Sequence, residues 1–166
     1  MSSSSNRKVA GIRERTDSQA AGWPEKLVEA FRTAHFDILI DPRPVTLSLY
    51  GVVPCGTHRL EKRLAVVTGW NPGMSRPDHA VNEQANKRLE ARLREDGLRY
   101  VPAVGRSPDR SHAEPSFAVF DLDADEARAL AEDFGQAAVF CWDGKRAHLE
   151  WCRPPQESDL GTNSGA

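Results

Sequence analysis

Residues 64–72 of the chain read Leu-Ala-Val-Val-Thr-Gly-Trp-Asn-Pro, and this stretch decides the predicted fold. Its first five residues form a nearly continuous apolar run, which is typical of a strand buried on both faces of a sheet. The glycine and proline that follow predict a turn at the end of that strand. We therefore expect residues 64–68 to form a central strand and the Trp-Asn-Pro segment to lie at one edge of the sheet.

Helices and strands on both sides of this stretch follow from hydrophobic periodicity and from local start and stop signals. Asp123 and Glu126 have the spacing of a capping box at a helix start, and Gly135 suits the position that follows a helix end. Asp143-Gly144 is a strong signal for a two-residue hairpin turn. The predicted elements are a helix over 24–34, strands over 36–40, 45–49 and 64–69, a helix over 79–95, strands over 98–104 and 116–121, a helix over 123–134, and strands over 137–142 and 145–151.

The order of these elements between residues 64 and 142 is βαββαβ, which predicts the fold class. We expect an α+β protein with a ferredoxin-like βαββαβ core, an extra N-terminal hairpin, an extra C-terminal strand, and helices packed on a mixed sheet. A single domain is expected over residues 22–152. The polar residues 1–21 and 153–166 predict disordered tails.

The composition limits the functional classes. The chain has 166 residues, three cysteines and a formal net charge of −2 from 22 Lys+Arg and 24 Asp+Glu. No apolar stretch approaches the roughly 18 residues of a membrane helix, and the N-terminus lacks the apolar segment of a secretory signal. We therefore expect a cytoplasmic protein with no membrane partner. The balance of charge also disfavours nucleic acid as a partner, because nucleic-acid binders usually carry a basic excess.

The cysteines and the missing motifs narrow the chemistry further. Three cysteines do not make a disulfide scaffold. A hairpin centred on residues 143–144 pairs Phe140 with Ala147 and leaves Cys141 away from Cys152, so no disulfide is expected between these two cysteines. Paired His or Cys spacing for a metal and glycine-rich phosphate loops are both missing from the sequence, so we expect neither a metal nor a cofactor.

The βαββαβ order brings separate polar segments to one edge of the sheet. A right-handed crossover makes the first two strands run in the same direction, and a tight reversal makes the third run the opposite way. The edge where the first strand ends then gathers four segments, which are residues 70–73, the start of helix 79–95, the loop 105–115 and residues 134–136. Convergence of this kind favours a binding site at that edge.

Two asparagines of helix 79–95 lie toward its inward face. At about 100° per residue, Asn82 falls inside the arc of apolar residues and Asn86 falls at its margin. An amide in such a place is costly unless its hydrogen bonds are met. Either Asn82 ties the helix to the Trp70–Pro72 loop, or one of the two asparagines faces a ligand held between helix and sheet.

The other candidates divide by chemistry. Trp70 offers an indole for stacking, or it closes the core as part of a rigid turn. Glu114 is a general base or an acceptor for a ligand N–H, or it forms a salt bridge to Arg110 or Arg106. The predicted ligand-binding residues are Trp70, Asn71, Asn82, Asn86, Ser116, Gln136, Arg76, Arg106 and Arg110, and Glu114 is the predicted catalytic residue.

A serine hydrolase is disfavoured. In an extended strand, His112, Glu114 and Ser116 are about 7 Å apart step by step, which is too far for a direct relay between serine, histidine and acid. The arginines, together with His112, are instead expected to hold a phosphate or a carboxylate.

Several of these segments together resemble a known family. Thr68-Gly69-Trp70-Asn71-Pro72, Asn82-x-x-x-Asn86-x-x-Leu89, Glu114-x-Ser116-Phe117 and Phe134-Gly135-Gln136 look like the motifs of the bacterial domain-of-unknown-function family 3293. The resemblance covers about residues 30–142, and Gly69 stands where the family pattern has Ala. It implies a bacterial origin and no known activity.

Two functions from different classes fit these features. The first is a polar, amide-rich site for a small metabolite that is anionic or nucleotide-like, with hydrolysis or group transfer depending on Glu114. The alternative is a non-catalytic regulatory or interaction module that binds protein or nucleic acid. RNA binders of this topology carry aromatics on one open sheet face, whereas Phe117 and Phe120 fall on opposite faces of their strand.

Overall fold

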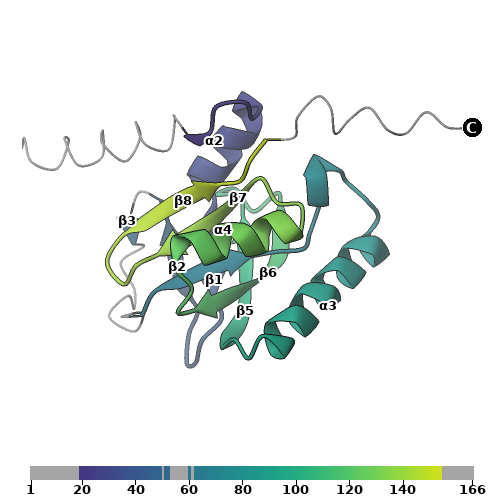
Figure 1. Cartoon of the computed structure of the whole chain (residues 1–166). Helices are drawn as coiled ribbons and strands as arrows, with labels where there is room; N and C mark the ends of the chain where they lie inside the picture. The colour runs from purple at the N-terminus through teal and green to yellow at the C-terminus, as the bar shows by residue number, and fades with distance from the viewer. Residues whose placement is uncertain (1–18, 50, 53–59, 61, 155–166) are drawn as a thin grey trace, which may run out of the picture.

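A computed structural model describes residues 19–49, 51–52, 60 and 62–154, and the protein is α+β over this part of the chain (Figure 1). The elements in chain order are α2 (Glu25–Thr33), β1 (His35–Ile38), β2 (Val45–Ser48), β3 (Gly51–Val52), β4 (Leu64–Val67), the 3-10 turn η2 (Pro72–Met74), α3 (His79–Glu95), β5 (Tyr100–Arg106), β6 (Ala113–Phe120), α4 (Ala124–Asp133), β7 (Ala138–Trp142) and β8 (Ala147–Trp151). The predicted N-terminal hairpin and the predicted strand after β7 are both present as β1–β2 and β8.

The strands form one eight-stranded sheet in the order β3-β2-β1-β5-β6-β4-β7-β8. Every strand pairing among the described residues is antiparallel, so the prediction of a mixed sheet is wrong. The reason lies in the two helical crossovers, because each of them skips a strand. The parallel-running strands β4 and β5 are separated by β6, and the parallel-running strands β6 and β7 are separated by β4.

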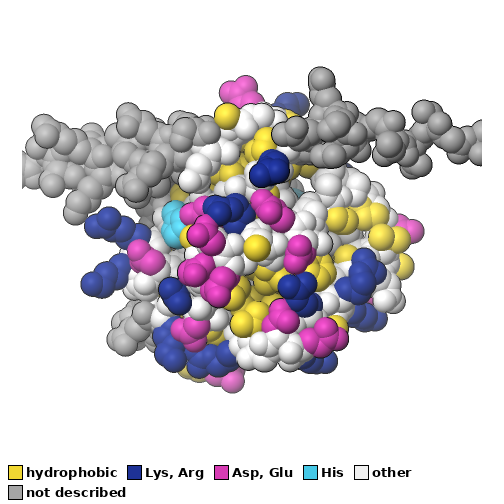
Figure 2. Space-filling model, viewed as in Figure 1, with side chains coloured by type: hydrophobic (Ala, Val, Ile, Leu, Met, Phe, Trp, Pro, Cys, Tyr) yellow, Lys and Arg dark blue, Asp and Glu magenta, His cyan; other side chains and the backbone are white. Residues whose placement is uncertain are grey.

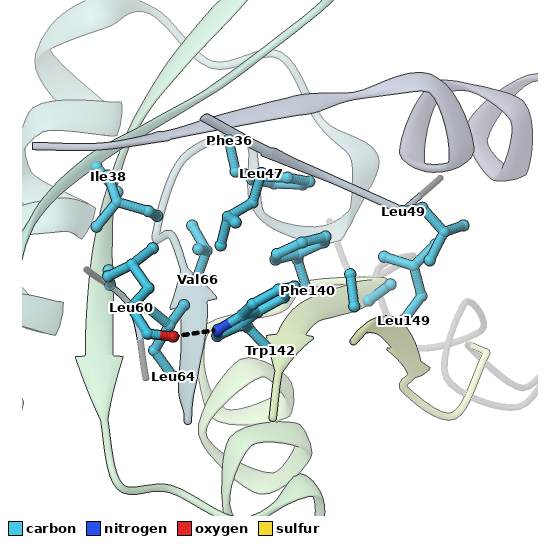
Figure 3. Packing of buried hydrophobic residues seen from close by; sticks show 14 of the residues in the cluster. Phe36, Ile38, Leu47, Leu49, Leu60, Leu64, Val66, Phe140, Trp142 and Leu149 are labelled. Carbon is cyan, nitrogen blue, oxygen red and sulfur yellow. Dashed lines mark hydrogen bonds between the residues drawn. The ribbon is translucent and has the colours of Figure 1, made fainter. Parts of the chain in front are cut away.

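The sheet is strongly curled. Phe36 on β1 and Phe140 on β7 stack with their ring centroids 4.3 Å apart, although these strands are four positions apart in the sheet. In a flat sheet, four steps would separate them by about 19 Å. The curl therefore encloses a core between the two ends of the sheet, which Figure 3 shows with Leu47 and Leu149 on either side of the stacked rings.

A second core covers the other face of the sheet. Helices α3 and α4 lie on this face (Figure 1), and Leu89 and Leu93 of α3 and Leu130 of α4 belong to its core. The central strand β4 contributes to both cores, with Val66 in the first and Val67 in the second. This arrangement confirms the prediction that β4 is buried on both faces.

The hairpin between β7 and β8 has a different register from the predicted one. Phe140 pairs with Leu149, and Ala147 pairs with Trp142 instead of Phe140. The turn is centred one residue later than predicted because the Asp143 carboxylate accepts the backbone N–H groups of the two residues that follow Gly144, at 2.8 and 2.7 Å. The pairing moves by two residues, so the same side chains still face the core. Cys141 and Cys152 are both free thiols, as predicted.

Charged side chains are interspersed over the face that carries α4 (Figure 2). Several of them join neighbouring elements: Arg92 of α3 bonds Asp133 of α4 at 3.3 Å, and Arg128 of α4 bonds Glu150 of β8 at 3.1 Å. None of the helices formed by the described residues is both long and apolar enough to cross a membrane.

Candidate functional site

One end of the curled sheet gathers the predicted site segments. The strand directions place the ends of β4 and β5 and the beginnings of β1, β6 and β7 at the same edge. Helix α2 lies over this edge (Figure 1) and is held there by aromatic contacts, since Phe31 meets the Trp151 ring at 5.4 Å. The indole N–H of Trp23 also donates to the Cys152 carbonyl at 3.1 Å.

The Trp-Asn-Pro segment forms a tight turn at this edge. Asn71 adopts the left-handed region, with φ 50° and ψ 52°, which asparagine tolerates better than most residues. Gly69 lets helix α3 approach closely, because a Cβ there would lie 2.8 Å from the backbone carbonyl of Ala85. On the other side, the Gly73 N–H donates to the Gly135 carbonyl at 2.7 Å. The turn is thus clamped between α3 and the α4–β7 connection.

Asn82 ties helix α3 to the turn, which is one of the two roles expected for it. Its side-chain oxygen accepts the backbone N–H of Asn71 at 2.8 Å, and its NH2 group donates to the Asn71 side-chain oxygen at 3.0 Å. The NH2 group of Asn71 then donates to Oε1 of Glu114 at 2.8 Å. Asn82 is only 3% exposed, so this chain of amides holds the turn, the helix and the start of β6 together.

Asn86 makes a second connection one helical turn later. Its side-chain oxygen accepts the Gly69 N–H at 2.7 Å, and its NH2 group donates to the Pro115 carbonyl at 2.8 Å. The Thr68 hydroxyl donates to the same carbonyl at 2.8 Å. Both polar groups of the Asn86 amide therefore hold the backbone, one just after the end of β4 and the other near the beginning of β6.

His112 and Glu114 are in contact, which the sequence argument did not expect. The Nε2 atom of His112 lies 3.0 Å from Oε1 of Glu114. His112 directly precedes β6, which begins at Ala113, and the two long side chains span the step of about 7 Å that separates residues two apart in a strand. Ser116 is buried and donates to the Glu114 backbone carbonyl at 3.1 Å. Its hydroxyl is therefore committed to the backbone, and the relay of serine, histidine and acid is not assembled.

Arg106 is neutralised by a neighbouring strand. Its guanidinium bonds both carboxylate oxygens of Asp37, at 2.6 and 3.2 Å, and the Thr46 hydroxyl donates to the same carboxylate at 2.7 Å. Burial acts to raise the pKa of Asp37, but the bonds from Arg106 and Thr46 outweigh it and hold that pKa below its usual value. Arg106 thus pairs with Asp37, whereas the salt bridge predicted as an alternative for Glu114 was to Arg110 or Arg106; in the structure Glu114 contacts His112.

A cavity of about 370 Å³ lies at this end of the sheet. Six of the predicted site residues line it: Trp70, Asn71, Arg76, Arg106, Glu114 and Gln136. Four others lie outside its lining: Asn82, Asn86, Arg110 and Ser116. The first group could touch a ligand directly, whereas the two asparagines and Ser116 position the turn and the strand that carry the first group.

One wall of the cavity was not anticipated from the sequence. Helix α2 contributes Leu27, Ala30 and Phe31 to the lining, and Ala34, the residue that follows the helix, adds to them. The four residues have the spacing i, i+3, i+4, i+7, which in a helix marks one face. That apolar stripe was visible in the sequence, but nothing in the sequence connected it to the Trp-Asn-Pro edge. The cavity therefore has an apolar wall on α2 and a polar wall on the turn and on β6.

The described residues do not form a cluster of side chains that could bind a metal ion. No cluster of three or more His, Cys, Asp or Glu side chains able to hold a metal occurs among the described residues. Burial raises the pKa of the Cys141 thiol to about 12, and it does the same for Cys152. Both thiols are thus poor nucleophiles and poor metal ligands. Cys55 lies outside the described residues.

Comparison with known families confirms the resemblance seen in the motifs. Residues 67–139 match the model of a family described as "Protein of unknown function (DUF3293)". This stretch contains the Trp-Asn-Pro turn, helix α3, Glu114 and Gln136. Helix α2 and β1, which complete the cavity, lie before it. No curated protein and no solved structure matches the chain.

Proposed function

We propose that this protein binds a small, nucleotide-like metabolite in the cavity between α2 and the Trp-Asn-Pro turn. The observation that carries the proposal is the pairing of one apolar wall with one polar wall around about 370 Å³. Small-molecule sites usually have volumes of about 300–1,000 Å³ and combine apolar walls with a few polar groups that fix orientation. A planar ring with polar edges suits both walls.

Trp70 and Arg76 have separate roles in this proposal. The half-buried indole of Trp70 meets the His79 ring edge-on, with centroids 5.3 Å apart, which supports a fixed surface for stacking a planar ligand. Arg76 is exposed at the cavity and can meet an anionic group of the ligand. Arg106 is not assigned that role because Asp37 already neutralises it.

Any hydrolysis or group transfer in this site would depend on Glu114. It is the one carboxylate that lines the cavity in the described part of the chain. Asn71 and His112 both lie within hydrogen-bond distance of Oε1, which supports a fixed carboxylate at the position a general base needs. The order β5-β6-β4-β7 also supports the prediction that residues 64–142 have ferredoxin-like topology.

The alternative of an interaction module has no comparable support. Phe117 packs against the second core and meets Tyr100, with centroids 5.4 Å apart. Phe120 packs against the first core, with the Arg99 guanidinium 4.5 Å from its ring. The two rings therefore face opposite sides of the sheet and do not form a joint stacking surface for RNA.

The proposal is tested by filling the cavity without touching its polar wall. Ala30 lies on the apolar wall, so Ala30→Phe occupies the space that a ligand ring needs. Lys26→Phe adds the same ring to an exposed position of α2 outside the lining and serves as the matched control. Thermal unfolding is then measured for all three proteins against a panel of nucleotides, amino acids and phosphorylated metabolites.

A ligand present at a hundred times its Kd stabilises a protein by about 2.7 kcal/mol, which is about 5–10 °C in Tm for a chain of this size. We expect such a shift for the wild type and for Lys26→Phe, but not for Ala30→Phe. If no compound raises the Tm of the wild type, or if the shift survives in Ala30→Phe, the cavity is not a metabolite site.

A further inference from the structure

The hydrogen bonds around Glu114 have a fixed direction. The backbone N–H of Asn71 can only donate, so the Asn82 atom at 2.8 Å from it must be the amide oxygen. The NH2 group of Asn82 then donates to the Asn71 side chain, so the atom of Asn71 that accepts must be the amide oxygen. The NH2 group of Asn71 is therefore the group that reaches Glu114, and Oε1 of Glu114 must act as an acceptor.

The tautomer of His112 follows from the hydrogen bond that it makes to Glu114. Because Oε1 of Glu114 accepts from Asn71, the imidazole nitrogen at 3.0 Å from Oε1 is placed to donate. His112 thus carries a proton on Nε2, and in its neutral form Nδ1 is an acceptor. Within the described residues, no hydrogen bond occupies Oε2 of Glu114.

Gln136, which also lines the cavity, has a second acceptor that no hydrogen bond between described residues uses. Its NH2 group donates to the Trp70 carbonyl at 3.0 Å and to the Phe134 carbonyl at 3.3 Å. Two carbonyl partners require the nitrogen on that side, so the amide oxygen is the end left over. Gln136 is bonded to Trp70, and Glu114 is bonded to Asn71. Because Trp70 and Asn71 are adjacent in the chain, Gln136 and Glu114 lie beside the same turn, and both line the cavity.

Most donors that the sequence offered to an anion are already committed. Arg106 bonds Asp37, and the NH2 group of Asn71 bonds Glu114. The hydroxyls of Ser75 and Ser107 donate to Pro72 and Asp109, respectively. The donors still open at the lining are the Arg76 guanidinium and the Trp70 indole N–H, because no hydrogen bond between described residues uses either of them.

We propose that the ligand presents N–H donors to this wall, as a primary amine, an amidine or an amino-substituted heterocycle does. This inference rests on the proposed function and specifies the chemical class that the site takes. Oε2 of Glu114 and the Gln136 amide oxygen accept the N–H groups, and the negative charge of Glu114 favours a donor that is cationic or strongly polarised. An anionic group of the same ligand lies away from Glu114, toward Arg76.

The test compares two planar probes of the same size, benzamidine and benzoate. Benzamidine offers only N–H donors, whereas benzoate offers only acceptors. Binding is followed by two-dimensional amide NMR through the signals of Trp70, Asn71 and Gln136. We expect benzamidine to bind at least ten times more tightly than benzoate in the wild type.

Glu114→Gln provides the decisive variant. Its amide oxygen can still accept from Asn71, while its NH2 group takes the place of the open Oε2 and turns an acceptor into a donor. We expect this variant to bind benzamidine at least ten times more weakly than the wild type does. Glu95→Gln is the control for the loss of charge, because it lies at the other end of α3, about 24 Å along the helix axis from its start.

Each outcome decides one question. Benzoate binding as tightly as benzamidine in the wild type, or unchanged benzamidine binding in Glu114→Gln, overturns the donor inference and leaves the cavity as a ligand site. If neither probe perturbs the cavity signals of the wild type, the donor inference fails, whereas the proposed function is decided separately by the thermal-shift panel and Ala30→Phe. The wild-type comparison decides the inference even where Glu114→Gln does not fold.

Discussion

Replacing Asn82 with Ala removes the partner of two polar groups of Asn71 at once. The backbone N–H of Asn71 loses its acceptor, and its side-chain oxygen loses a donor. An unsatisfied buried N–H costs about 1–3 kcal/mol, and a lost side-chain hydrogen bond costs about 0.5–1.5 kcal/mol. Asn82 is 3% exposed, so water does not readily replace it. We expect the free energy of unfolding to fall by about 2–4 kcal/mol.

The loss is measured by calorimetric or circular-dichroism melting. For a chain of this size, each kcal/mol lowers Tm by about 2–4 °C, which predicts a decrease of about 4–16 °C for Asn82→Ala. Gln84→Ala is the matched control, because Gln84 lies exposed on the same helix, and its Tm should stay within about 2 °C of the wild type.

Hydrogen exchange adds a local readout. The Asn71 amide should exchange faster in Asn82→Ala than in the control, since its acceptor is gone. A Tm for Asn82→Ala that equals that of Gln84→Ala, together with an unchanged exchange rate at Asn71, would refute the role of the amide chain in holding the turn.

Three further outcomes follow from other contacts. Gly69→Ala places a Cβ 2.8 Å from the α3 backbone, so overpacking should cost about 1–3 kcal/mol and lower Tm by about 2–12 °C in calorimetry. Asp37, whose pKa lies below its usual value of 3.8, stabilises the fold above that pH and less as the pH falls through its folded pKa; Asp37→Asn should therefore lower Tm at pH 7 and reduce the further loss of Tm below about pH 4. Because the thiol pKa values of Cys141 and Cys152 are about 12, a Cys55→Ser variant should show no thiol reactive to Ellman's reagent at pH 8 until it is denatured.

Local signals in the sequence were sufficient for most of the elements. Helix α3 begins at His79 and ends at Glu95, as predicted. Helix α4 has the predicted capping box, in which Asp123 and Glu126 each satisfy a backbone N–H of the other. The helix ends and the capping box are formed by residues that are close together in the chain. All the residues of each interaction therefore lie within one short stretch of sequence, where a pattern can be recognised.

Features that depend on distant partners were harder to predict. The antiparallel character of the whole sheet comes from which strands lie between the crossovers, and no single element contains that information. The contact of His112 with Glu114 was missed because a spacing of about 7 Å between alternate residues of a strand leaves out the length of the two side chains, which meet at 3.0 Å. The α2 wall was missed because an apolar stripe does not say which surface it covers.

The polar edge of the site was predictable for a different reason. The βαββαβ order alone brings the Trp-Asn-Pro turn, the start of α3, the β5–β6 loop and residues 134–136 to one end of the sheet, and the hydrogen bonds of Asn71 and Gln136 connect three of these segments to the turn. The role of each side chain at this edge was harder to predict from the sequence. Asn82 falls on the inward face of its helix in both alternatives, and the sequence does not show whether a ligand or the Asn71 backbone faces it there.

The two walls of the cavity have separate origins in the chain. The polar wall belongs to the matched stretch 67–139, whereas the apolar wall belongs to α2, which precedes it. Substitutions along the side of α2 that lines the cavity can therefore change its volume while the hydrogen-bonding groups of the polar wall stay in place. Under the proposed function, α2 therefore sets the bulk of the ligand, and residues of the matched stretch set its polar recognition.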